Sequence, residues 1–144
     1  MANSGRDQEY LGVDTNVLVA YLDGGHPSHK KTTWLADESI VLNPTIAHEA
    51  YHTLVFWARW DPVEARKAVW DACSDVNNLF VNQTFRTTNT GLELAVRHGL
   101  GGRDALILAS LLASKVKEFR TFDKNLLALK QVSFGRASLV VKPA

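Results

Sequence analysis

The sequence predicts an α/β domain in which the strands of a mostly parallel sheet are joined by helical crossovers. Short apolar runs alternate along the chain with longer segments of helical periodicity, which is the pattern of such a sheet. The 144 residues are 46% hydrophobic and 22% charged, so the chain can build an ordinary core. We find no repeat, linker or low-complexity stretch and expect a single domain over residues 1–144.

Five strands are expected where short apolar runs occur. They are residues 9–13, 40–42, 79–81, 118–122 and 137–141. Helices are expected where the apolar residues recur with helical spacing or where the segment is apolar nearly all round. They are residues 15–22, 26–39, 44–59, 62–75, 88–98, 103–115 and 124–130.

Two helix starts and one helix end carry local signals. Asn43 before Pro44 and Asp61 before Pro62 each place a capping side chain ahead of a proline in the first helical position. Gly99 follows the helical pattern of 88–98 and is expected to end that helix.

Charge and cysteine content exclude several classes of protein. Sixteen Lys and Arg against 15 Asp and Glu leave a formal charge of +1, so no global field attracts nucleic acid or an anionic membrane. The single cysteine, Cys73, excludes an internal disulfide and suits a reducing cytoplasm. The opening segment is too polar for a signal peptide, and no apolar stretch is long enough to span a bilayer. We therefore expect a cytoplasmic protein.

Three acidic residues occupy positions that are unusual for surface charges. Asp14 and Asp123 each follow an expected strand, and the carboxyl ends of parallel strands are where ligand crevices form. Asp104 stands in the first turn of an apolar helix, directly after Gly101 and Gly102. The alternative explanations are local: Asp14 and Asp104 as helix caps, and Asp123 as a turn residue.

A fourth acid lies in the segment His48-Glu-Ala-Tyr-His52, which has the spacing by which zinc peptidases hold their metal. Turning the helix by 100° per residue places Glu49 at the border of the apolar stripe. His48 and His52 are expected to project toward the other side. As an ordinary residue at the edge of the stripe, Glu49 needs no functional role.

Four carboxylates that converge in one site repel one another, each close pair by roughly 1 to 4 kcal/mol at about 4 Å. A divalent cation removes this repulsion, and oxygen ligands select hard ions such as Mg²⁺ or Mn²⁺ over zinc. Sites with one ion and with two ions are both compatible with the sequence.

Four segments in this order resemble the motifs of a PIN-domain ribonuclease of the VapC toxin type. They are GVDTNVLVAYL, HEAYHTL, GGRDALILAS and TFDKNL, and they cover nearly the whole chain. The acids Asp14, Glu49, Asp104 and Asp123 match the acidic site of that family position by position. Thr15 and Asn16 match the polar positions after the first acid, and Thr121 matches the hydroxyl before the last.

The resemblance implies a three-layer α/β/α fold around a parallel sheet and metal-dependent hydrolysis of RNA phosphodiester bonds. In such a site Asp14, Asp104 and Asp123 would hold Mg²⁺, or Mn²⁺, while Glu49 positions a second ion or the attacking water. The family also implies a homodimer that is silenced by a cognate antitoxin. Residues 73–90 carry no motif, so the dimer surface and the choice of RNA stay open.

Because the acidic site itself repels RNA, nearby cations are needed to hold the phosphates. Arg103 and Lys124 adjoin two of the acids and are the favoured candidates. The four tryptophans are expected mainly in packing, with Trp57 or Trp60 as alternatives for a dimer or antitoxin contact.

Three other functions are weighed against the ribonuclease. A zinc peptidase needs a third ligand, for which only a downstream acid such as Glu64 or Glu93 is available, because the extended metzincin pattern is absent. An aspartyl phosphatase needs an acid where the chain has Asn16, which cannot transfer the proton. A non-catalytic RNA-binding module of the same fold gains nothing from four repelling carboxylates.

Overall fold

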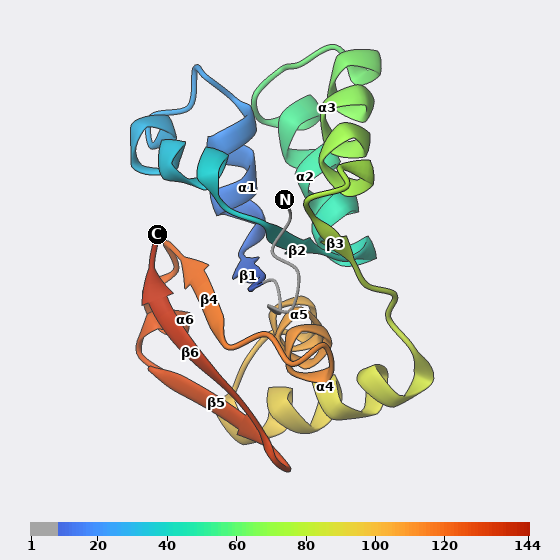
Figure 1. Ribbon diagram of the computed structural model, residues 1–144, viewed down its shortest axis with the longest axis vertical. Coiled ribbons are helices and arrows are strands. Elements are labelled where there is room, and N and C mark those ends of the chain that lie inside the picture. The colour runs from blue at the N-terminus through green and yellow to red at the C-terminus, as the bar shows by residue number, and fades with distance from the viewer. Residues whose placement is uncertain (1–8) are drawn as a thin grey trace, which may run out of the picture.

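The computed structural model describes residues 9–144, so the expectation for the polar opening segment falls almost wholly outside the described residues. Within this range a six-stranded sheet has the order β3-β2-β1-β4-β6-β5 (Figure 1). All neighbouring strands are parallel except β5 and β6, which are antiparallel. The strands are β1 Leu11–Val13, β2 Ile40–Leu42, β3 Leu79–Phe80, β4 Glu118–Thr121, β5 Gln131–Phe134 and β6 Ala137–Pro143.

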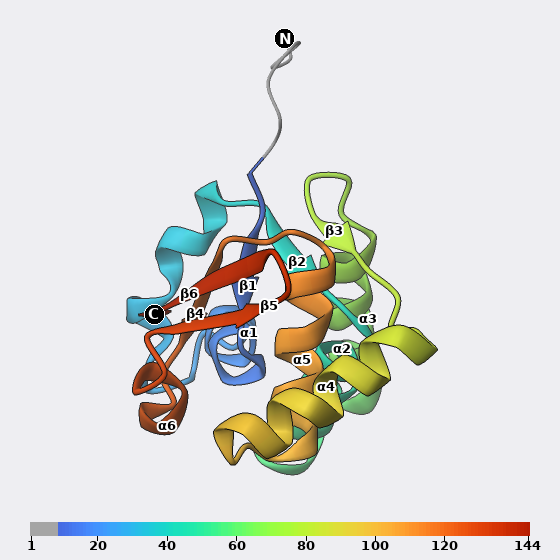
Figure 2. The same cartoon turned by 90° about the horizontal axis from the view of Figure 1, so that it is seen from below.

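Helices flank this central sheet, as the two perpendicular views show (Figures 1 and 2). They are α1 Thr15–Leu22, α2 Pro44–Phe56, α3 Pro62–Ser74, α4 Phe85–His98, α5 Gly102–Ala113 and α6 Lys124–Leu127. The mostly parallel α/β/α architecture is therefore confirmed. None of the helices in the described part of the chain combines the length and hydropathy that crossing a bilayer requires.

The capping signals position the helices as expected. Asn43 accepts a hydrogen bond from the backbone N–H of Ile46 at 2.9 Å and begins α2, and Asp61 begins α3 in the same way. Gly99 ends α4 in the left-handed conformation, with a φ of 65°. The apolar helix α5 is buried from Ile107 through Leu112 and contributes five of these side chains to the hydrophobic core.

The structure corrects two expectations for local structure. Residues 26–39 do not form one helix but two short 3₁₀ helices, η1 His29–Lys31 and η2 Thr33–Asp37. The hydroxyl of Thr32 between them bonds back to the carbonyl of His29 at 2.8 Å, and such local bonds compete with a continuous helix. The strand β5 was not expected, because this edge strand buries only Val132.

A further difference lies at the start of α4. This helix begins three residues earlier than its apolar pattern indicates, at Phe85, because Thr84 and Thr87 form a reciprocal capping box. Thr84 accepts from the backbone N–H of Thr87, while the hydroxyl oxygen of Thr87 accepts from that of Thr84 at 2.6 Å. Hydroxyl caps of this kind extend a helix beyond its buried residues.

The end of α5 offers a test of backbone strain. Lys115 adopts a φ of 60°, and the backbone N–H of Val116 bonds to the carbonyl of Leu111. Gly99 and Leu100 close α4 with the same arrangement. Because a side chain makes this conformation costly, we expect Lys115→Gly to raise the free energy of unfolding by about 1 kcal/mol. Urea unfolding monitored by circular dichroism measures the change.

The matched control for this substitution is Gly99→Ala. It adds a Cβ at the equivalent position of α4, where no neighbouring atom lies within 4 Å, so only the backbone conformation is penalised. We expect it to lower the free energy of unfolding by about 1 kcal/mol. Equal stability of the wild type and the Lys115→Gly protein would show that the strain at Lys115 is absent in solution.

Candidate active site

A cavity of about 600 Å³ opens where α1, α2, α5 and the end of β4 meet. All four acids singled out from the sequence line it. The complete lining is Asp14, Thr15, Asn16, His48, Glu49, His52, Thr53, Trp57, Arg103, Asp104 and Asp123. Residues separated by more than 100 positions in the chain are thus brought into one site.

The sheet accounts for two of these positions. Asp14 directly follows β1 and Asp123 lies two residues after β4. Because β1 and β4 are parallel neighbours, their carboxyl ends lie at the same edge of the sheet. Asp14 is the N-cap of α1 and Asp123 the N-cap of α6, so both acids cap a helix as well as facing the cavity.

Helices bring the other two acids to the same edge. Asp104 lies in the first turn of α5, whose N-cap is Gly101, so Asp104 is not the cap of that helix. Glu49 projects from the middle of α2, one turn beyond its capped start. The expected positions of all four acids therefore agree with the structure.

Asp14 is held on both of its carboxylate oxygens. Its Oδ1 accepts a hydrogen bond from the backbone N–H of Thr15 at 2.8 Å, and its Oδ2 accepts one from the hydroxyl of Thr121 at 2.7 Å. Thr121 in turn accepts from the backbone N–H of Asp123 at 3.0 Å. The hydroxyl of Thr121 thus connects the ends of the two strands.

Glu49 is also held by two partners. The hydroxyl of Thr15 donates to its Oε1 at 2.8 Å, and the guanidinium of Arg103 lies 3.0 Å from its Oε2. The Arg103 side chain is 79% exposed, so this ion pair is weak and open to exchange with another anion. Asn16 lines the cavity as well and faces solvent.

The electrostatics of the site favour neutralisation of its acids. Burial, assisted by the charges of Asp104 and Asp123, raises the pKa of Asp14 from 3.8 to about 6, although the hydrogen bonds from Thr121 and Thr15 act in the opposite direction. Burial likewise raises the pKa of Asp104, with added repulsion from Asp123 and Glu49. Asp14 and Asp104 therefore both sense the negative charge of neighbouring acids in the cavity.

The residues present fit a hard divalent cation. Within residues 9–144 no three His, Cys, Asp or Glu side chains form a preassembled metal-binding group. The donors around the cavity are nevertheless carboxylate oxygens, which Mg²⁺ and Mn²⁺ prefer, and their mutual repulsion is the energy that a cation would relieve.

The two histidines of the peptidase-like segment do not point away from Glu49 as expected. Both His48 and His52 are exposed and line the same cavity. Three residues apart on a helix, His52 and Glu49 project only about 60° from each other around the helix axis. A cavity of this width is therefore lined by both side chains. The side chains of His48, Glu49 and His52 nevertheless form no three-ligand metal group in the described structure.

Two cavity residues were not predicted for the site. Thr53 and Trp57 follow Glu49 at intervals of four residues on α2, which is the helical spacing that indicates a shared face. The sequence favours packing for Trp57, with a dimer or antitoxin contact as the alternative, yet Trp57 is 78% exposed. Of the two favoured cations, Arg103 lines the cavity, whereas Lys124 is exposed on α6 and does not.

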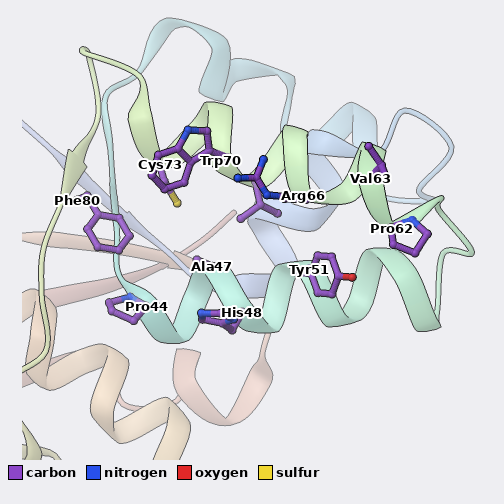
Figure 3. Close-up of a pocket in the computed structure, with 11 residues that line it drawn as sticks. Pro44, Ala47, His48, Tyr51, Pro62, Val63, Arg66, Trp70, Cys73 and Phe80 are labelled. Atoms are coloured by element: carbon purple, nitrogen blue, oxygen red, sulfur yellow. The ribbon is translucent and has the colours of Figure 1, made fainter.

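A second cavity, of about 750 Å³, lies between α2 and α3 (Figure 3). Its walls are largely apolar side chains that face one another from the two helices, among them Tyr51, Val63 and Trp70. His48 lines both cavities, so the apolar cavity adjoins the acidic one. None of the four acids belongs to it.

Comparisons with known proteins agree with this geometry. The family model described as PIN domain matches residues 12–133. No curated protein sequence matches the chain.

Several solved structures are similar in fold. A sarcin-ricin loop cleaving toxin, VapC20 of Mycobacterium tuberculosis, has a TM-score of 0.68 at 18% identity, covering 79% of this chain and 90% of that one. A toxin–antitoxin complex from Klebsiella pneumoniae has a TM-score of 0.61 at 18% identity, with coverages of 82% and 90%. DNA-bound VapBC from Salmonella typhimurium has a TM-score of 0.62 at 10% identity, with coverages of 94% and 98%.

Proposed function

Since the chain belongs to the PIN-domain family, we propose that it is a metal-dependent endoribonuclease that hydrolyses RNA phosphodiester bonds. The observation that carries this proposal is the single cavity lined by Asp14, Glu49, Asp104 and Asp123. A binding module has no use for four carboxylates whose charges oppose one another, whereas a hydrolytic metal site requires them.

Asp14, Asp104 and Asp123 are the residues that would hold Mg²⁺ or Mn²⁺. When bound there, the cation lowers the pKa of a coordinated water and neutralises charge on the phosphate. Thr121 keeps Asp14 oriented through its 2.7 Å hydrogen bond, and Thr15 orients Glu49 in the same way. The supporting hydroxyls therefore fix the carboxylates before substrate arrives.

Arg103 is the residue we assign to the RNA phosphate. Its guanidinium is exposed at the cavity and pairs with Glu49 in the absence of substrate. Exchange of Glu49 for a phosphate oxygen would release that carboxylate to position the water, and guanidinium suits a phosphate in geometry and charge. Lys124, outside the lining, would contact a more distant phosphate.

We further propose that the protein is the toxin of a toxin–antitoxin pair in the cytoplasm and acts as a homodimer. Complexes of similar fold with antitoxins motivate the partner. The apolar cavity between α2 and α3 adjoins the acidic site through His48 and exposes Val63 and Trp70, which suits a protein partner that covers both. The homodimer stays a prediction that sedimentation analysis of the purified protein can check.

Incubation of the purified protein with total cellular RNA tests the function. We expect cleavage with Mg²⁺ or Mn²⁺ and none after chelation with EDTA, because the carboxylates have no other way to polarise water. Asp104→Asn is expected to be inactive. Asp71→Asn is the matched control, since Asp71 is an exposed acid on α3 that pairs with Lys67, outside the acidic cavity. Cleavage that persists in EDTA would contradict the proposal.

The peptidase alternative is distinguished by the same preparations. Glu49, its general base, is occupied by Thr15 and Arg103, and no third ligand is assembled with His48 and His52 in residues 9–144. Proteolysis of casein that depends on zinc and is lost in His48→Ala would favour the peptidase over the ribonuclease.

A further inference from the structure

The rim of the acidic cavity carries an aromatic side chain that the proposed chemistry does not use. Trp57 lies at the end of α2, is 78% exposed and lines the cavity together with Glu49 and Asp104. Its indole N–H makes no hydrogen bond within the described part of the chain. The ring is thus fully available to a ligand of the cavity.

The other three tryptophans have different surroundings. Trp34 lies beneath the guanidinium of Arg120, with 4.8 Å between that group and the ring centroid, and its indole donates to the carbonyl of Lys31. Trp60 packs against the core, and Trp70 lines the apolar cavity between α2 and α3. Packing therefore explains Trp34 and Trp60 but leaves Trp57 unexplained.

Aromatic character extends over the last two turns of α2. The rings of His52 and Phe56 lie 4.8 Å apart, both side chains are exposed, and His52 and Trp57 line the same cavity. Glu49 and Trp57 are eight residues apart, which is about 12 Å along the helix axis. This separation suits a base on a nucleotide that neighbours the one whose phosphate meets the carboxylates.

The negative charge of the cavity favours an uncharged contact with RNA, such as stacking of a base on an aromatic ring. Among its lining residues, Arg103 is the one side chain with a permanent positive charge, against four carboxylates. Phosphate contacts alone therefore hold an RNA strand weakly at this place. Stacking of bases on aromatic rings adds affinity without charge, and it requires bases that are not paired in a duplex.

We propose that Trp57 is a stacking platform for an unpaired base of the RNA next to the scissile phosphate. This inference rests on the proposed ribonuclease function. A protein partner is the less favoured occupant, because Trp57 shares its cavity with the acids and Arg103, while the apolar cavity offers Trp70 to a protein.

Binding of a fluorescein-labelled RNA hairpin, measured by anisotropy in Mg²⁺, tests this assignment. The cleavage-deficient Asp14→Asn protein serves as the parent, with a blunt duplex of the same stem as the comparison ligand. We expect the parent to prefer the hairpin and Trp57→Ala to weaken hairpin binding about 5- to 100-fold. Trp57→Phe should retain part of the affinity, because it keeps an aromatic ring.

The salt dependence and a second variant separate stacking from other roles. Because stacking releases no counterions, Trp57→Ala should leave the slope of affinity against salt unchanged, whereas Arg103→Ala should reduce it. Trp70→Ala, which removes another exposed indole outside the acidic cavity, should bind as the parent does. RNA should quench the indole emission of the parent more strongly than that of Trp57→Phe.

Three outcomes overturn the inference. Unchanged hairpin binding by Trp57→Ala, while the wild-type protein cleaves RNA with Mg²⁺, removes the stacking role and leaves the ribonuclease intact. An equal loss of hairpin binding in Trp70→Ala shows that the loss is not specific to the indole at the acidic cavity. Absence of both RNA binding and RNA cleavage in the wild type removes the proposed function together with this inference.

Discussion

Replacing Asp14 by Asn is expected to abolish RNA cleavage and, at the same time, to make the metal-free protein more stable at pH 7. The activity should fall by about 10²- to 10³-fold, the loss typical of removing one group that stabilises developing charge. Asp14 is central to the site, since it touches Thr15 and Thr121 and senses the charges of Asp104 and Asp123.

The gain in stability follows from the raised pKa of Asp14. Its carboxylate is 7% exposed, and burial with nearby acids raises its pKa to about 6, compared with 3.8 in an unfolded chain. Holding it ionised in the folded state therefore costs about 3 kcal/mol at pH 7. Asn carries no charge and can still accept from Thr15, so we expect a net gain of about 1 to 2 kcal/mol.

The pH dependence has a definite sign. A raised pKa means that the folded state binds the proton more tightly than the unfolded state, so the cost is absent below about pH 4. It grows as the pH rises from about 4 to 6 and is complete above about 6. The gain in stability of Asp14→Asn should therefore be present at pH 7 and be lost near pH 4, where only the weaker hydrogen bonding of Asn remains and the variant should be slightly less stable than the wild type.

Urea unfolding at both pH values, in EDTA, measures the stability difference, and cleavage of total RNA measures the activity. Asp71→Asn is the matched control and should change neither quantity, because Asp71 is exposed on α3. An Asp14→Asn protein that cleaves RNA at the wild-type rate would remove Asp14 from the mechanism. A protein less stable than wild type at pH 7 would show that its hydrogen bonds outweigh the cost of its charge.

Three of the four acids could be predicted because each follows from a strong local signal. Asp14 comes directly after β1 and Asp123 two residues after β4, and neighbouring parallel strands end at one edge of the sheet. Asp104 opens an apolar helix that has to pack in the core. Such residues are positioned by the sheet and the core, and both can be recognised from the hydrophobic pattern.

Residues whose role depends on the tertiary surroundings could not be predicted in the same way. Trp57 continues the apolar stripe of α2, and this pattern favours packing in the core. The helix ends at Phe56, however, and the ring of Trp57 lines the cavity. His52 was placed on the wrong side because helical projection does not give the width of a cavity. The pairing of Arg103 with Glu49 depends on how α5 approaches α2, for which the sequence has no local signal.

Replacing Gly91 by Leu is expected to be the most destabilising change outside the site. Gly91 is buried in α4, and a Cβ built there would lie 3.2 Å from the Cα of Leu106 and 3.5 Å from its backbone nitrogen. Because these neighbours are backbone atoms of α5, they cannot move aside as the end of a flexible side chain can. A Leu side chain therefore requires the two helices to separate.

The expected cost is about 3 kcal/mol of unfolding free energy, at the upper end for overpacked cores, and a fall of about 6 to 12 °C in Tm. Gly91→Ala should be nearly neutral, since better helix propensity offsets a contact that is only slightly too close. Gly102→Leu is the matched control in α5, where a Cβ meets no atom within 4 Å. Thermal unfolding measures the Tm of each variant. An equal fall in Tm for Gly91→Leu and Gly102→Leu would show that α4 and α5 do not approach closely at Gly91. If the loss is confined to Gly91→Leu, that glycine is what lets α5 pack where it places Asp104 in the acidic cavity.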